Sequence, residues 1–99
     1  MSKRSVDSYR FHYTYRIEHP SGLYYCGVHS SDDPYNNKYM GSGVDLKAAY
    51  KRFPKKEWRK IIVEVFDKRF QAEWFEAVTL DDKMLHDPNC LNKIKGFRR

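Results

Sequence analysis

Tyrosine is unusually frequent among the reactive side chains of this sequence, with eight among 99 residues. Tyr15 and Tyr25 belong to segments 11–17 and 23–28, which have the period-2 alternation or the aromatic content of β-strands. Residues 19–22 (His-Pro-Ser-Gly) between them are a turn signal, so the two segments should form a hairpin. If its loop centres on the proline, Tyr15 lies directly opposite Tyr25, with Cβ atoms about 5 Å apart.

Histidine and cysteine occur at spacings similar to those of zinc sites. The two examples are Cys26-x2-His29 and His86-x3-Cys90. Cys26 lies on a predicted strand, however, where an offset of three sends His29 to the opposite face. The pattern therefore argues against structural zinc and favours buried free thiols, and two distant cysteines fit a reducing compartment.

Basic residues gather in two stretches of a chain whose net charge is +6. The first stretch covers residues 47–60 with Glu57 as its only acid, and the second, 93–99, has no acid. A solvated surface explains any single lysine, but two clusters in a net-positive domain favour binding to phosphates. We predict DNA contacts from Lys47, Lys51, Arg52, Lys55, Lys56 and Arg59.

The elements that must position these residues follow from local patterns. Residues 44–53 are predicted to be a helix with Leu46 and Ala49 on its buried face, ended by a proline, and residues 60–66 form a β-branched strand. Residues 29–42, rich in Ser, Asp, Asn, Gly and Pro, are predicted to be a loop.

A second helix is predicted from residue 69 to residue 79. Its apolar residues Phe70, Trp74, Ala77 and Val78 share a stripe that we expect to be buried. The resulting order predicts an α+β fold, with a small three-stranded, mainly antiparallel sheet (β-β-α-β-α) flanked by helices. The length allows one domain, 10–99, after a flexible arm at 1–9.

Residues 13–29 (YTYRIEHPSGLYYCGVH) resemble the two signature strands of the GIY-YIG nucleases. Tyr15 falls on the tyrosine of the first motif, and Tyr25-Cys26-Gly27 falls on the second. Residues 39–43 (YMGSG) and the helix after them are similar to a block found in bacteriophage members. A later strand, a helix with glutamates and residues 87–92 (DPNCLN) match the remaining blocks in order.

The resemblance implies a metal-dependent, homing-endonuclease-like enzyme that nicks or cleaves DNA. In such enzymes a tyrosine of the second motif, here Tyr25, is the general base, and Tyr15 would position it or the attacked phosphate. Tyrosine titrates near 10, so Tyr25 would need a cation nearby. Asn92 matches a family asparagine that contacts phosphate or braces the site. One glutamate would hold a single ion, Mg²⁺ or Mn²⁺.

The sequence departs from the family at one functional position and offers two glutamates at another. The active-site arginine that many members carry has no clear counterpart, and His29 and Lys38 are the available substitutes. Glu73 lies at the edge of the predicted buried stripe, whereas Glu76 points away from it. We therefore predict Glu73 as the catalytic metal ligand.

Several alternatives remain open at this point. A non-catalytic nucleic-acid-binding or inhibitor module with the same fold is the main one, and a small protein–protein adaptor is another. A separate DNA-reading domain does not fit, so specificity is low, arises in a homodimer or comes from a DNA-targeting partner. With no apolar run long enough for a membrane span and no signal peptide, we expect a cytoplasmic protein of a bacterium or a phage-infected host cell.

Overall fold

A three-stranded antiparallel sheet, ordered β2-β1-β3, forms the centre of the molecule. The computed structural model describes residues 5–92. Its strands are β1 (Phe11–Glu18), β2 (Tyr24–Ser31) and β3 (Arg59–Phe66), and its helices are α1 (Val44–Arg52), α2 (Arg69–Thr79) and α3 (Asp82–Leu85). Short 3-10 turns lie at η1 (Val6–Ser8), η2 (Pro34–Asn36) and η3 (Lys55–Glu57). The α+β fold predicted from sequence is confirmed.

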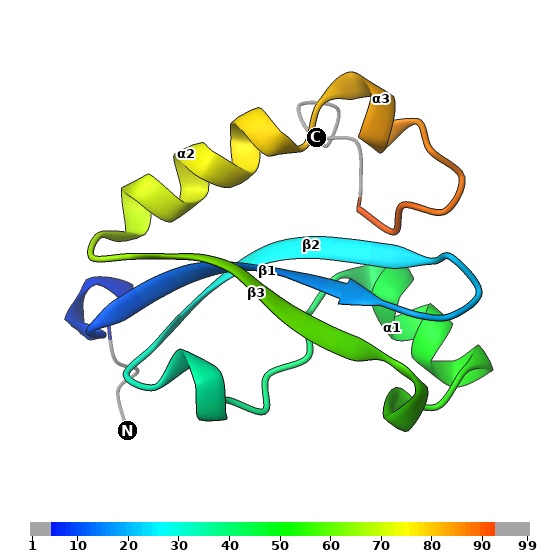
Figure 1. Ribbon diagram of the computed structural model, residues 1–99, viewed down its shortest axis with the longest axis horizontal. Helices are drawn as coiled ribbons and strands as arrows, with labels where there is room; N and C mark the ends of the chain where they lie inside the picture. The colour runs from blue at the N-terminus through cyan, green and yellow to red at the C-terminus, as the bar shows by residue number, and fades with distance from the viewer. Residues whose placement is uncertain (1–4, 93–99) are drawn as a thin grey trace.

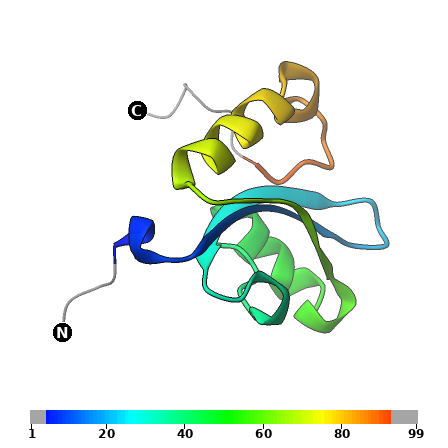
Figure 2. The same cartoon turned by 60° about the vertical axis from the view of Figure 1, so that its left-hand side comes forward.

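The helices cover the sheet from opposite sides, as Figures 1 and 2 show: α2 and α3 lie on one side, and α1 with the η2 and η3 turns lies on the other. The sequence did not predict α3. Part of the expected 1–9 arm and all of the basic tail 93–99 lie outside the described residues. No helix in the described part is long and apolar enough to cross a membrane.

The core lies between the sheet and α1. Tyr13, Tyr15 and Ile17 alternate along β1 and are almost completely buried on that face. They pack with Leu46 and Ala49 of α1 and with Trp58. The predicted buried face of the first helix is therefore confirmed.

The hairpin register differs from the prediction by two residues. Tyr15 pairs with Gly27 and Ile17 pairs with Tyr25. The connection includes Leu23, because the His19 N–H donates to the Leu23 carbonyl at 3.0 Å. An even shift keeps every side chain on its predicted face, so Tyr15 and Tyr25 still meet diagonally, with ring centroids 6.2 Å apart.

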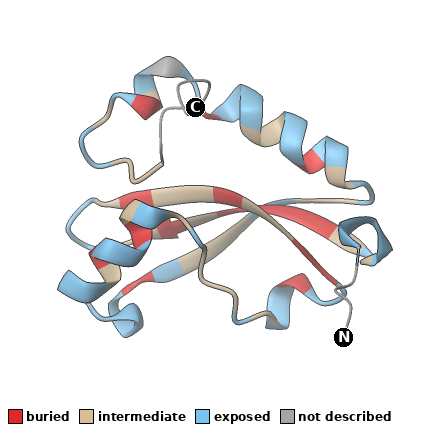
Figure 3. Cartoon of the chain, turned by 180° about the vertical axis from the view of Figure 1, so that it is seen from behind, coloured by how far each residue is buried: buried red, intermediate tan, exposed pale blue. Residues whose placement is uncertain are grey.

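The predicted buried stripe of α2 is wrong. Phe70, Trp74 and Val78 are 68%, 66% and 55% exposed, whereas Ala72 is completely buried. Figure 3 shows that much of the α2 surface is exposed. The sheet face beneath the helix presents short or polar side chains such as Thr14 and Ser30, and the small Ala72 side chain lets α2 approach them closely. The same rotation turns Glu76 toward the sheet.

Candidate active site

Tyr25 is fitted against the glycine-rich block that precedes α1. A Cβ added to Gly43 would lie 2.6 Å from Tyr25 Cε1 and 3.2 Å from its hydroxyl oxygen, so only glycine permits this approach. Gly43 is also the N-cap of α1. The Tyr25 hydroxyl consequently lies at the positive end of a nine-residue helix, which favours a negatively charged oxygen there.

Tyr15 lies across its strand partner Gly27. A Cβ at Gly27 would lie 2.4 Å from the Tyr15 hydroxyl oxygen, so the close approach of the Tyr15 ring requires glycine at this position. Burial raises the pKa of Tyr15, and the neighbouring hydroxyls of Tyr25 and Tyr39 raise it further. Tyr15 therefore stays protonated and is available as a hydrogen-bond donor inside the site.

The pKa of Tyr25 is raised, chiefly by burial and next by the charges of Tyr39 and Glu76. Hydrogen bonding with Tyr15 acts in the opposite direction and lowers it. We expected a nearby cation, from a side chain or a metal, to lower this pKa. Among the groups of the protein, the largest influences on the pKa of Tyr25 are burial and groups that become anionic. A base at Tyr25 would therefore depend on a positive charge supplied from outside the protein.

Glu76 is the glutamate that the fold brings to the tyrosines. It lines a small cavity under α2 with Cys26 and Gly27, and its charge acts on the pKa of both Tyr25 and Cys26. Glu73 instead points outward: its side chain is 57% exposed and forms an ion pair with Arg69 at 2.9 Å. The choice of Glu73 rested on the buried stripe that the structure contradicts.

The described residues contain no group of three or more His, Cys, Asp or Glu side chains that could hold a metal. A site with one carboxylate, Glu76, and a phenolic oxygen nearby still fits a hard cation such as Mg²⁺, which keeps several water ligands in proteins. The residues present are therefore compatible with one ion and do not suit a cation that needs a full protein cage.

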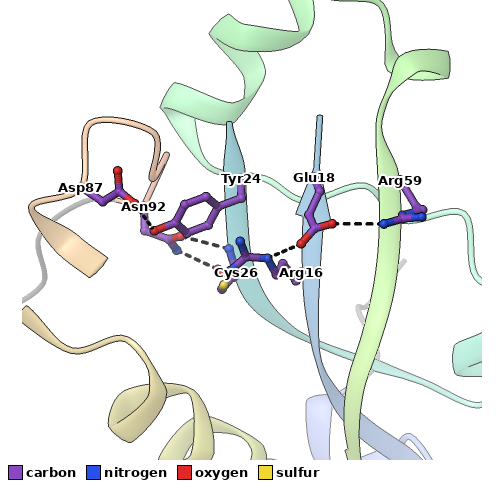
Figure 4. A network of polar contacts seen from close by, with 7 residues as sticks. All are labelled: Arg16, Glu18, Tyr24, Cys26, Arg59, Asp87 and Asn92. Carbon is purple, nitrogen blue, oxygen red and sulfur yellow. Dashed lines mark hydrogen bonds and ion pairs between the residues drawn. The ribbon is translucent and has the colours of Figure 1, made fainter. Parts of the chain in front are cut away.

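Asn92 braces the second motif. Its amide nitrogen donates to the Cys26 carbonyl at 2.7 Å, and its amide oxygen accepts the Cys26 N–H at 3.0 Å. Figure 4 shows these bonds beside the hydrogen bond from the Tyr24 hydroxyl to Asp87 at 2.9 Å. Backbone bonds of Tyr24 to Asn89 and Leu91 extend the same contact. Of the two roles predicted for Asn92, this geometry corresponds to bracing.

His29 and Lys38 have different environments. His29 stacks on Tyr39 with ring centroids 3.7 Å apart and touches Tyr13 edge-on at 5.8 Å. Burial lowers the pKa of His29, and the charges of Lys60 and Arg69 lower it further, so its ring is neutral near pH 7. Lys38 is exposed. The fold thus packs the His29 ring against Tyr13 and Tyr39 and places Lys38 on the surface.

Lys60 has a role that the sequence did not indicate. Its Nζ donates to the carbonyls of Asn37 at 3.1 Å and Tyr39 at 2.7 Å. It lies 5.5 Å from the Tyr13 ring centroid. Lys60 therefore fixes the loop that carries Tyr39, and its lowered pKa results from burial.

The six residues predicted to contact DNA are all exposed, and they lie on or next to α1 and η3. Arg59 also forms an ion pair with Glu18 at 3.3 Å, visible in Figure 4. Figure 1 shows α1 and η3, which carry five of the six, on the side of the sheet opposite α2. Its contact with DNA stays a prediction.

The GIY-YIG catalytic domain family matches residues 11–85, so the chain belongs to that family. Endonuclease segA of Enterobacteria phage T4 is 36% identical over 91 residues, which cover 88% of this chain and 40% of segA. Two other proteins of that phage, segB and segE, are 32% and 26% identical over 87 residues, covering 87% of this chain and 39% and 42% of their own lengths.

The chain thus spans about two fifths of the length of the curated relatives it matches. No solved structure gives a significant match.

Proposed function

We propose that this domain is a metal-dependent DNA endonuclease that hydrolyses phosphodiester bonds, nicking or cleaving the duplex. The observation that carries the proposal is the cavity under α2, where Glu76 lines the same space as Tyr15 and Gly27 of the two signature strands. Family membership and the similarity to endonuclease segA of phage T4 support the same activity.

Under this proposal, water attacks the phosphorus and the bond to the leaving oxygen breaks. Tyr25, as phenolate, takes the proton of the attacking water, while the Tyr15 hydroxyl holds Tyr25 in place. Glu76 is the ligand for one Mg²⁺ or Mn²⁺, which when bound supplies positive charge for the leaving oxygen. Asn92 holds the backbone of Cys26, the residue that follows Tyr25 on β2.

Target choice is a separate matter from the chemistry. The positive surface of α1 and η3 would bind the DNA backbone without reading its sequence. A homodimer, a further segment or a separate DNA-targeting partner would then supply specificity, since the matched relatives are more than twice as long as the aligned region.

A plasmid-nicking assay in Mg²⁺ and in EDTA tests the proposal. Tyr25→Phe and Glu76→Gln should each abolish nicking and still bind DNA. Glu73→Gln is the matched comparison on the same helix and should still cut in Mg²⁺. Loss of cutting in Glu73→Gln with retention in Glu76→Gln would assign the metal to the outer glutamate. Nicking by neither the wild type nor any variant in Mg²⁺ or Mn²⁺ would favour the non-catalytic DNA-binding module instead.

A further inference from the structure

A polar pocket separate from the Glu76 cavity lies at the C-terminal end of β2. It has a volume of about 300 Å³, and its lining includes His29, Ser30, Asn37 and Arg69. These residues come from β2, the following loop and the first turn of α2, so only the tertiary fold brings them together. None of them belongs to the metal site proposed above.

Arg69 is the charged group of this pocket. One of its terminal nitrogens donates to the Ser30 hydroxyl at 3.0 Å, and its Nε donates to Glu73 at 2.9 Å. The guanidinium is therefore held in place by Ser30, which is itself buried and shares a 2.7 Å hydrogen bond with His12. A guanidinium carries five N–H donors, so these two bonds leave donors for an anion.

The helix α2 and the strand β2 both run from the pocket to the candidate active site and fix the distance between them. Arg69 and Glu76 are seven residues apart on α2, which places them on the same face two turns apart, about 10.5 Å along the helix. Beside them, Ser30 and Cys26 are four residues apart on β2, about 13 Å along the strand. Arg69 is thus too far along α2 to share a phosphate with Glu76, but it lies in line with it.

We propose that the pocket of Arg69, Ser30 and His29 binds a DNA backbone phosphate of the cleaved strand, a short distance along that strand from the scissile one. The strand β2 keeps the two sites at a constant spacing. A phosphate held there would fix the register of the strand in the active site, which is the positioning that phosphate contacts provide in protein–DNA complexes. The inference rests on the proposed nuclease function.

Binding of a catalytically inactive Tyr25→Phe protein to duplex DNA, measured across a salt series, tests the charge. Adding Arg69→Gln should reduce the slope of log K against log salt by about one. Arg69→Lys, which keeps the charge and loses the fork, should retain the slope and bind less tightly. Lys83→Gln on α3 is the control for net charge and should leave the slope nearly unchanged. Glu73→Gln should strengthen binding, because it frees Arg69 from its ion pair.

A phosphate-ablation experiment locates the contact. After the wild-type nick has been mapped, duplexes carry one neutral methylphosphonate in turn at each phosphate near it. At one position on the cleaved strand, the methylphosphonate should weaken DNA binding by the Tyr25→Phe protein roughly tenfold, which is the effect of losing a charged hydrogen bond. In the protein that also carries Arg69→Gln, the same methylphosphonate should have no effect on binding.

The phosphate pocket would be overturned, even if the enzyme cuts DNA, by either of two results. One is an equal salt slope of DNA binding for Tyr25→Phe with and without Arg69→Gln. The other is that the losses of affinity from Arg69→Gln and from the methylphosphonate are additive at every position. If the wild type does not nick, the proposed function fails. The salt slopes and the Glu73→Gln arm still decide whether the pocket binds phosphate. Thermal unfolding of each variant separates a lost contact from a lost fold.

Discussion

Replacing Asn92 with alanine should separate the two roles that the sequence allowed for this residue. The side-chain amide makes two hydrogen bonds to the backbone of Cys26, at 2.7 and 3.0 Å, in a partly buried position. Each such bond contributes about 1 kcal/mol net, so Asn92→Ala should reduce the free energy of unfolding by about 2 kcal/mol. In a domain of this size that lowers Tm by roughly 10 °C.

The rate of nicking should also fall, because Cys26 lies between Tyr25 and Gly27 and its backbone would no longer be held at the edge of β2. DNA affinity measured in the Tyr25→Phe background should change little, since the amide is engaged by the protein. Urea unfolding, nicking rate and DNA binding would be measured together on each variant. Asn89→Ala, which removes an exposed side chain of the same type three residues away, is the matched control and should change stability by less than about 0.5 kcal/mol.

A direct contact between Asn92 and phosphate predicts the reverse pattern: DNA affinity and rate fall while stability is unchanged. That outcome would refute the bracing role. Asn92→Asp adds a second check, because it keeps an acceptor for the Cys26 N–H but places a carboxylate oxygen against the Cys26 carbonyl. Asn92→Asp should therefore destabilise the protein, although aspartate and asparagine have nearly the same shape.

Three further predictions follow from the same geometry. Gly27→Ala should displace the Tyr15 ring and lower both stability and nicking, because the new Cβ would lie 2.4 Å from its hydroxyl oxygen; an unchanged unfolding midpoint in urea would contradict this. Burial raises the pKa of Tyr25, and a general base acts only when deprotonated. The nicking rate under saturating Mg²⁺ should therefore rise with pH, up to about tenfold per pH unit between 7 and 9. A nicking rate that does not change with pH would argue for another base. Exchanging Lys47 and Lys51 for alanine should reduce the slope of log K against log salt for DNA binding by up to about two units. An unchanged slope would show that DNA does not bind on this face of α1.

The amino-acid sequence determined the local elements of this protein. Alternation along residues 11–17 and the helical spacing of Leu46 and Ala49 predicted β1 and α1 to within a residue or two, because these patterns depend on neighbours close in the chain. The ordered motifs around Tyr15 and Tyr25 also indicated the family that the comparison later confirmed. The face of the sheet on which both tyrosines lie was predictable too, since a strand alternates strictly.

Tertiary structure alone decided the register between β1 and β2 and which face of α2 packs on the sheet. The register depended on whether Leu23 joined the loop or the strand, which a hydrogen bond to His19 settles. Hydrophobic periodicity located the apolar stripe of α2 correctly but did not reveal which side packs. The sheet offers that helix short and polar groups such as Thr14 and Ser30, so Ala72 and Glu76 face inward while Trp74 stays exposed. Burial is a property of two surfaces, and one segment of sequence describes only one of them.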